Sequence, residues 1–345
     1  MTLQVGVIGV GLMGATHVGL LTTAVSDAAV VAVSDASAEN AGRVAREAGV
    51  GSIHADALDL VRDPHVGAVV IASPAQTHEA FVLACLEAGK PVLCEKPLAA
   101  TVEATRRILD AEVALGHRLV QVGFMRRFDP GYADMKRRID SGELGAPMLV
   151  HCAHRNPTVP HTFDSEMIIT DTVVHEIDVA RWLLHEEIVR TTVYTPRSTS
   201  HAAEGVRDPQ FVVLETEAGV LVDVEAFVNA RYGYDIRCEV VGELGTVSLS
   251  NPAIVHVRSE GEAAAQVPNG FQDRFAGAYV QELQTWVNAA ADGRATGPSA
   301  WDGHAAAAVS QACVESLRAR RSVDVRLGER PAMYADAGRS YRPVG

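Results

Sequence analysis

The glycine-rich stretch near the N-terminus constrains the fold more than any other part of the chain. Gly9, Gly11 and Gly14 form a GxGxxG pattern that follows an apolar run and precedes a helical pattern. Such glycines permit a tight turn and let the backbone approach a pyrophosphate at the helix N-terminus. Asp35 ends the next apolar run, 21 residues after Gly14, where a carboxylate binds the ribose hydroxyls of a dinucleotide. The alternative is a glycine turn without a ligand, beside a solvated aspartate.

Asp35 also indicates which dinucleotide would bind. A carboxylate at this position repels the 2′-phosphate of NADP, and no arginine lies closer than Arg43. The sequence therefore favours NAD.

Short apolar runs alternate with amphipathic stretches through the first third of the chain. Strands are expected at residues 5–9, 30–35, 67–73, 91–95 and 118–124, and helices at 12–24, 37–48, 76–89 and 101–115. Continuous apolar strands separated by helices are typical of a doubly wound parallel sheet. We therefore expect an α/β protein whose residues 1–123 form a dinucleotide-binding Rossmann domain.

The pattern changes after residue 123. A helix is expected at 130–142, strands near 147–154, 188–195, 210–216, 219–228, 236–242 and 245–249, and helices again at 275–292 and 301–319. Several strands are joined by short turns, which is typical of a mostly antiparallel sheet. We expect an α+β domain with a large open sheet over residues 124–330, followed by an irregular tail, 331–345.

Length and charge narrow the class of protein. A chain of 345 residues is long enough for two domains. A formal net charge of −13 argues against nucleic acid or an anionic membrane as a partner. No apolar run has the length of a membrane span, and no signal peptide is recognisable. The five scattered cysteines lack CxxC spacing, so we expect reduced thiols in a cytoplasmic protein.

Two segments lie at the ends of expected strands, at the carboxyl edge of the parallel sheet where ligands bind in such folds. Ser73 and Pro74 are candidate cofactor contacts. His78 is a third candidate, although it could equally be an exposed residue at a helix start. Glu95 and Lys96 end another strand, and Pro97 restricts Lys96 to an extended backbone. A lysine in this position could also be an ordinary solvated residue.

Asp171 and His175 are candidate catalytic residues. They stand four residues apart in an expected helix from about 170 to 184, so they share one face of it. The buried stripe of that helix would contain Val173, Ile177, Ala180 and Leu184. The alternatives are that Asp171 is an N-cap and that His175 lies on the surface.

A further polar cluster, HCAHRNPT, contains His151, His154, Arg155 and Asn156. Its HxxH spacing does not predict zinc, because residues three apart in a strand point to opposite faces and no third ligand follows. We expect no metal. The cluster better suits a polyhydroxylated ligand, as do Arg126 and Tyr234, although isolated residues of these types are more often structural.

In combination, GVGLMG, CEKP and D-x-x-x-H resemble the glucose-fructose oxidoreductase/inositol dehydrogenase superfamily. VQVGFMRRFDPGY, DTVVHEID, YGYDI and AWDG resemble its inositol 2-dehydrogenase family in particular. The resemblance implies a Rossmann domain, an open-sheet α/β domain and a homotetramer assembled through those sheets. It also implies NAD-dependent oxidation of myo-inositol to scyllo-inosose.

The resemblance also implies a role for each matching residue. Lys96, Asp171 and His175 would be catalytic. The implied substrate contacts are Arg126, His154, Asn156, Thr172 and Tyr234; the cofactor contacts expected are Gly9, Gly11, Leu12, Met13, Gly14, Asp35, Ser73, Pro74, His78, Glu95, Lys96 and Gln121. The chain departs from the family at Leu12-Met13 and in the 197–208 loop, which affects cofactor affinity and substrate tolerance.

The mechanism expected from these residues is proton removal coupled to hydride transfer. His175 would accept the hydroxyl proton, Asp171 would orient its ring, and Lys96 would stabilise charge on the oxygen. The alternatives are a related dehydrogenase acting on scyllo-inositol, another inositol isomer or a pyranose, and a non-catalytic NAD-binding sensor. A metal-dependent isomerase is a more distant alternative.

Overall fold

A computed structural model describes residues 2–249, 256–259 and 261–335 of the chain. The chain divides into two compact units. Within the described residues, the first unit comprises residues up to Phe128 together with Gly277–Ala307 and Glu329–Ala335, and the second comprises Asp129–Ala276 and Ala308–Gly328. Three segments that were expected in the second domain or the tail, 124–128, 277–307 and 329–335, therefore belong to the first unit. The other residues of the expected tail, 336–345, lie outside the described residues.

The first unit contains a six-stranded parallel sheet in the order β3-β2-β1-β4-β5-β6. This order is that of a doubly wound dinucleotide-binding fold, which confirms the expected Rossmann domain. Its strands are β1 (Leu3–Ile8), β2 (Ala28–Ser34), β3 (Ser52–His54), β4 (Ala68–Ile71), β5 (Val92–Glu95) and β6 (Val120–Gly123).

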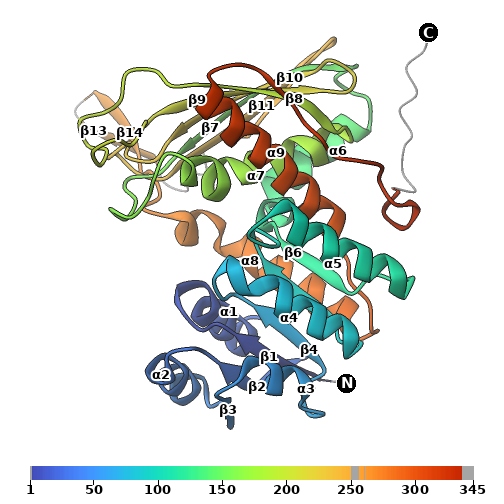
Figure 1. Cartoon of the computed structure of the whole chain (residues 1–345). Coiled ribbons are helices and arrows are strands. Elements are labelled where there is room, and N and C mark those ends of the chain that lie inside the picture. Colours follow the sequence, from blue (N-terminus) through green and yellow to red (C-terminus); the bar gives the residue numbers. More distant parts are fainter. Residues whose placement is uncertain (1, 250–255, 260, 336–345) are drawn as a thin grey trace. The chain divides into compact units, whose positions relative to one another are not determined.

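Helices cover both faces of this sheet (Figure 1). The helices near it in sequence are α1 (Leu12–Thr23), α2 (Ala38–Ala48), α3 (Ala57–Arg62), α4 (Ala75–Glu87) and α5 (Val102–Leu115). On one face, Val5, Val7 and Leu93 pack with residues of α1 and α2 in a continuous apolar core. Leu283 and Trp286, from the later helix α8 (Phe271–Ala290), complete this core. The sheet is therefore closed by a segment far away in the sequence.

The second unit contains a seven-stranded mixed sheet in the order β12-β11-β7-β10-β9-β8-β15. Its strands are β7 (Pro147–Arg155), β8 (Ile188–Tyr194), β9 (Gln210–Thr216), β10 (Leu221–Phe227), β11 (Asp235–Gly242), β12 (Thr246–Ser248) and β15 (Val323–Asp324). Only β7 and β10 pair in parallel, so the expected mostly antiparallel sheet is confirmed.

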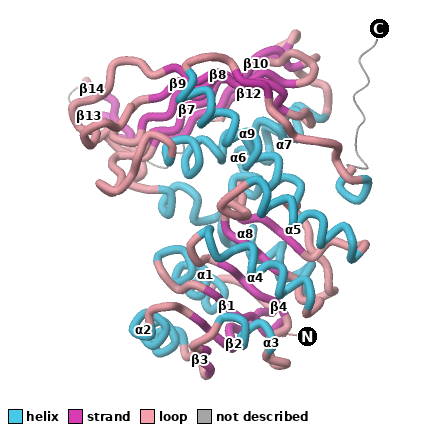
Figure 2. Tube along the Cα trace, in the orientation of Figure 1, coloured by secondary structure: helices cyan, strands magenta, loops and turns pink. Residues whose placement is uncertain are grey.

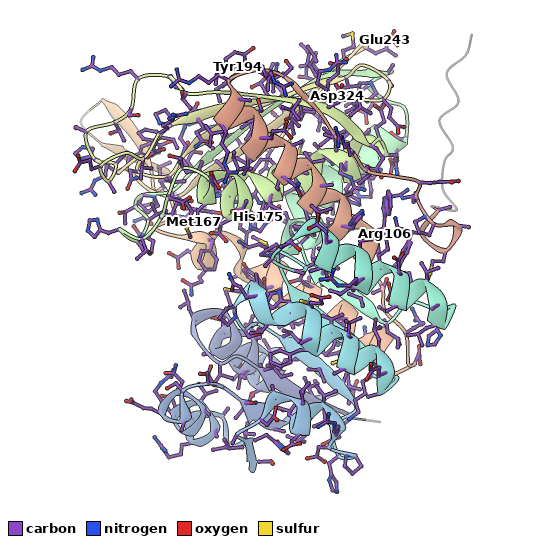
Figure 3. All side chains as sticks on the ribbon, viewed as in Figure 1. Arg106, Met167, His175, Tyr194, Glu243 and Asp324 are labelled. Atoms are coloured by element: carbon purple, nitrogen blue, oxygen red, sulfur yellow. The ribbon has the colours of Figure 1, made fainter. Side chains whose placement is uncertain are left out.

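One face of this mixed sheet is covered by helices (Figure 2). These are α6 (Pro130–Asp140), α7 (Val174–Leu184) and the later part of α9 (Ala300–Ala319). Figure 3 shows His175 on the helix side of the sheet and Tyr194 on the opposite side. No helix of the second unit's described residues covers that opposite side in these views.

Several short elements were not expected from the sequence. They are β3, α3, the two-stranded sheet of β13 (His256–Ser259) and β14 (Glu262–Ala265), β15, the 3-10 helices Met125–Phe128 and Ala332–Tyr334, and a π-helix at Ile168–Val173. The π-helix corrects the expected α-helix from residue 170, since the α-helical part begins only at Val174. Within the described residues, no helix combines the length and the apolar character that crossing a membrane requires.

Candidate active site

The glycine turn between β1 and α1 is shaped so that side chains cannot enter it. Gly9 has φ +79°, and a Cβ there would collide with the backbone of Ser73. A Cβ at Gly14 would collide with the carbonyl oxygen of Gly9. Gly11, the N-cap of α1, provides no side-chain cap for the first turn of the helix, and the space beside it is open. Such an uncapped helix start, beside a turn that only glycine fits, suits an anionic pyrophosphate.

The carboxylate of Asp35 fixes the position of this turn. One of its oxygens accepts a hydrogen bond from the backbone N–H of Val10 at 2.7 Å, and the other from that of Ser37 at 2.8 Å. Asp35 and Ser73 line the same cavity of about 610 Å³ at the carboxyl edge of the sheet. The residues present therefore fit a dinucleotide whose ribose hydroxyls would donate to Asp35.

Three of the expected cofactor contacts are buried. His78 is buried, and its ring lies 2.7 Å from the carbonyl oxygen of Ser73 and 2.8 Å from that of Pro97. The expectation that it could be an exposed residue is therefore wrong. Glu95 bonds to the buried His17 of α1 at 2.7 Å. Gln121 is buried, and neither its amide nitrogen nor its oxygen has a hydrogen-bond partner among the described residues.

The remaining expected contacts of the first unit differ in exposure. Pro74 precedes α4 and is exposed, whereas Met13 is only partly exposed. Leu12 is 67 % exposed at the start of α1. Lys96 is partly buried and follows the last residue of β5, and Arg126 is buried in the 3-10 helix after β6.

In the second unit, the candidate catalytic pair spans the junction between the π-helix and α7. Asp171 lies in the π-helix and is exposed, whereas His175 lies in the first turn of α7 and is 7 % exposed. Two alternatives are therefore wrong, because Asp171 is not an N-cap and His175 is not a surface residue. Thr172 is buried between them. π-helical turns inside helices occur frequently at functional sites.

The burial of α7 also differs from the expected single stripe. The four predicted stripe residues are buried, but so is every residue from Val174 to Ala180. Polar side chains are included in this burial, among them Glu176 and Asp178. Buried carboxylates require partners, so this helix carries more than packing residues.

Four polar side chains of the second unit lie together on the helix-covered side of the mixed sheet. His154 of β7 bonds through Nδ1 to a carboxylate oxygen of Glu176 at 3.1 Å, and both side chains are buried. The rings of His154 and His175 are 6.3 Å apart between centroids, and Tyr234 contacts His154 edge-on at 5.7 Å. The structure thus brings together three predicted residues and Glu176, which the sequence analysis did not identify although it follows His175 directly.

The other members of the expected HCAHRNPT cluster point elsewhere. His151 is exposed and bonds to Asp223 at 2.5 Å, while Arg155 forms ion pairs with Glu225 and Asp235 on the same side of the sheet. The Glu225 carboxylate holds the pKa of the Arg155 guanidinium above its usual value. Strand alternation explains the separation, because residues 151, 153 and 155 face away from His154.

Asn156 follows β7 and is partly buried. Its backbone N–H donates to the carbonyl oxygen of Phe227 at 3.0 Å, and its own carbonyl accepts from Ala230. These two bonds hold the residue next to the strand end that presents His154.

Comparisons with known proteins match the whole arrangement. Residues 3–124 match the family model described as oxidoreductase family, NAD-binding Rossmann fold, and residues 136–325 match the model of its C-terminal alpha/beta domain. Inositol 2-dehydrogenase 1 of Saccharopolyspora erythraea is 57% identical over 97% of this chain and 99% of its own length. Inositol 2-dehydrogenase of Azotobacter vinelandii is 48% identical over 98% of this chain and 100% of its own length.

A solved structure is similar over the same length. The myo-inositol dehydrogenase of Lactobacillus casei, in complex with NAD(H) and myo-inositol, has a TM-score of 0.94 and 38% identity, covering 97% of this chain and 100% of its own. The scyllo-inositol dehydrogenase of the same organism has a TM-score of 0.87 and 25% identity, covering 94% and 99%. The dinucleotide turn, the two sheets and these matches together show that the chain belongs to the oxidoreductase family with an NAD-binding Rossmann fold and a C-terminal alpha/beta domain.

Proposed function

We propose that this enzyme oxidises myo-inositol to scyllo-inosose with NAD. Two lines of support lead to this substrate. The relatives that are 48% and 57% identical over nearly the whole chain are named inositol 2-dehydrogenases. The structure solved with myo-inositol is also more similar in sequence, at 38% identity, than the one solved with scyllo-inositol, at 25%.

The observation that carries the proposal is the buried group of His154, Glu176, His175 and Tyr234. Buried polar side chains are costly unless they have partners, so a group of this kind is retained where a polar ligand is handled. A cyclitol presents several hydroxyl groups, each of which can donate and accept hydrogen bonds. The Glu176 carboxylate accepts a hydrogen bond from Nδ1 of His154, which fixes the orientation of that ring within the group.

In the proposed mechanism, His175 removes the proton of the reacting hydroxyl. Asp171 orients that imidazole and stabilises its cationic form. The ammonium group of Lys96 stabilises the negative charge that develops on the oxygen. NAD, when bound, accepts the hydride from the carbon. Arg126, Asn156 and Thr172 would hold the other hydroxyl groups.

The test combines a substrate panel with one variant. We expect NADH formation with myo-inositol to exceed that with scyllo-inositol, other inositol isomers and pyranoses. His175→Gln should reduce kcat by about 10²- to 10⁴-fold while the protein stays folded. His117→Gln, at an exposed position, is the matched control. Near-native turnover of His175→Gln would contradict the role assigned to His175. A preference for another polyol would show that this polyol, and not myo-inositol, is the substrate. Tight NADH binding without turnover of any polyol would indicate a non-catalytic sensor.

We also propose that the enzyme is a homotetramer that uses the uncovered side of the mixed sheet. Exposed apolar residues lie on the strands of that side, with Tyr194 at 56 %, Leu221 at 43 %, Phe211 at 38 % and Leu149 at 37 % exposure. Strand register places them on one face. Apolar surface of this kind favours association. Light scattering should give four times the chain mass of 36.7 kDa, and a monomer would contradict the proposal.

A cytoplasmic location is proposed as well. All five cysteines are buried and none forms a disulfide, as expected in a reducing compartment.

A further inference from the structure

Two buried histidines contact the residues on either side of Lys96. His17 of α1 is 0 % exposed and bonds to the side chain of Glu95. His78 of α4 is 1 % exposed and bonds to the carbonyl oxygen of Pro97. Each histidine therefore contacts an immediate neighbour of the lysine in sequence. Both come from helices that begin at the loops lining the cofactor cavity.

The first contact continues to the lysine itself. A carboxylate only accepts hydrogen bonds, so Nε2 of His17 carries the proton that it shares with Oε1 of Glu95 at 2.7 Å. Oε2 of the same carboxylate accepts the backbone N–H of Lys96 at 3.2 Å. A Cβ at Gly123 would lie 3.0 Å from that oxygen, so the glycine leaves room for the carboxylate. The result is a chain of bonds from α1 to the lysine backbone.

The second contact holds His78 between two segments. Nε2 lies 2.7 Å from the carbonyl oxygen of Ser73, and Nδ1 lies 2.8 Å from that of Pro97. The tautomer of the ring decides which of the two carbonyl oxygens accepts its proton. In either tautomer the ring lies between the loop after β4 and the segment after β5.

We infer that His17 and His78 are positioning residues that fix Lys96 with respect to the cofactor turn. The inference rests on the proposed function, in which the ammonium group of Lys96 acts on the reacting oxygen. Neither histidine needs to touch the substrate or the cofactor. A loss of position of about 1 Å at a reacting group can reduce the rate about 10²-fold. The histidines should therefore affect kcat more than the affinity for NADH.

The kinetic test compares removal with conservative replacement. His17→Leu and His78→Leu should each lower kcat by about 10- to 100-fold, with the dissociation constant for NADH, measured by fluorescence, nearly unchanged. His17→Gln places an amide donor where Nε2 was and should recover most of kcat, and His78→Asn retains the bond to Pro97 and should recover part of it. His65→Leu, whose side chain is 87% exposed, is the matched control.

One measurement does not depend on turnover. The reactivity of Lys96 toward trinitrobenzenesulfonate, read by peptide mass spectrometry, should increase in both leucine variants and not in the control.

Some results would overturn the inference. It fails if folded leucine variants keep native kcat and native Lys96 reactivity, or if kcat and NADH affinity fall together without recovery in His17→Gln. If the enzyme oxidised no polyol, the proposed function would fail, while lysine reactivity would still decide the positioning role. If a leucine variant does not fold, His78→Asn decides. It keeps only the bond to Pro97, so Lys96 reactivity should still be raised, and native reactivity in this variant would overturn the inference.

Discussion

Replacing Asp35 by asparagine should destabilise the protein even without cofactor. The two backbone N–H groups that Asp35 binds, those of Val10 and Ser37, go to different carboxylate oxygens. Asparagine has one carbonyl oxygen, so it can keep only one of these bonds and turns an N–H group toward the other. Asp164 provides the matched control, because its two backbone bonds, from residues 166 and 167, both go to Oδ1. Asparagine can keep both bonds there.

The size of the effect follows from the bond that is lost. A hydrogen bond to a charged group contributes about 1.5–3 kcal/mol to stability. For domains of this size, 1 kcal/mol corresponds to roughly 2–4 °C in the unfolding midpoint. The unfolding midpoint of Asp35→Asn should therefore lie roughly 3–12 °C below that of wild type. Asp164→Asn should unfold at the same temperature as wild type.

The assay is thermal unfolding of cofactor-free protein, followed by intrinsic fluorescence at neutral pH. Equal melting of wild type and Asp35→Asn would refute the reasoning, as would an equal loss in both variants. A practical consequence concerns cofactor preference. Removing the carboxylate to admit the 2′-phosphate of NADP also loosens the glycine turn, so such a change needs a replacement acceptor for the Val10 N–H.

Three further predictions follow from buried groups. Gly14→Ala should weaken NADH binding by about 10- to 100-fold, because its Cβ would displace the Gly9 carbonyl. Gly19→Ala, in the same helix but with open space around it, should bind NADH normally. Equal NADH affinities of the two variants in titration would contradict this prediction. Burial raises the pKa of Glu112 above its usual 4.5. As pH falls toward 4.5, the folded state therefore takes up this proton before the unfolded state does, and wild type should gain stability relative to Glu112→Gln. A difference in free energy of unfolding between the two proteins that stays constant with pH, measured in urea, would exclude this linkage. Burial raises the pKa of the Cys85 and Cys313 thiols to about 12. Ellman's reagent should therefore label these two thiols only after the protein unfolds. Rapid labelling of them in the folded protein would be inconsistent with that burial.

The parallel sheet was predictable because its signals are local. Each expected strand of residues 1–123 overlaps an observed one, since apolar runs between helical patterns are characteristic of buried parallel strands. The edge strand Ser52–His54 has only one large apolar residue and carries no such signal. The π-helix at Ile168–Val173 was not predictable from periodicity, because the apolar spacing there also fits an α-helix.

The site was predictable where function depends on the backbone of one turn, as at Gly9 and Gly14. It was not predictable where function depends on tertiary partners. His78 was left open between cofactor contact and exposure, and its two carbonyl partners come from residues 73 and 97. His17 did carry a signal: with Gly14, Val18 and Leu21 it occupies the buried face of α1, where a histidine needs a partner.

The late return of α8 to the first sheet affects how the polypeptide can be made and recombined. Leu283, Trp286 and Val287 cover apolar side chains whose own strands are synthesised far earlier. During synthesis, residues 1–123 therefore leave the ribosome with part of their apolar core exposed, and that surface stays uncovered until α8 has also left the ribosome. Grafting the nucleotide-binding module onto another enzyme requires two separate inserts, and a single cut near residue 123 would yield an aggregating fragment.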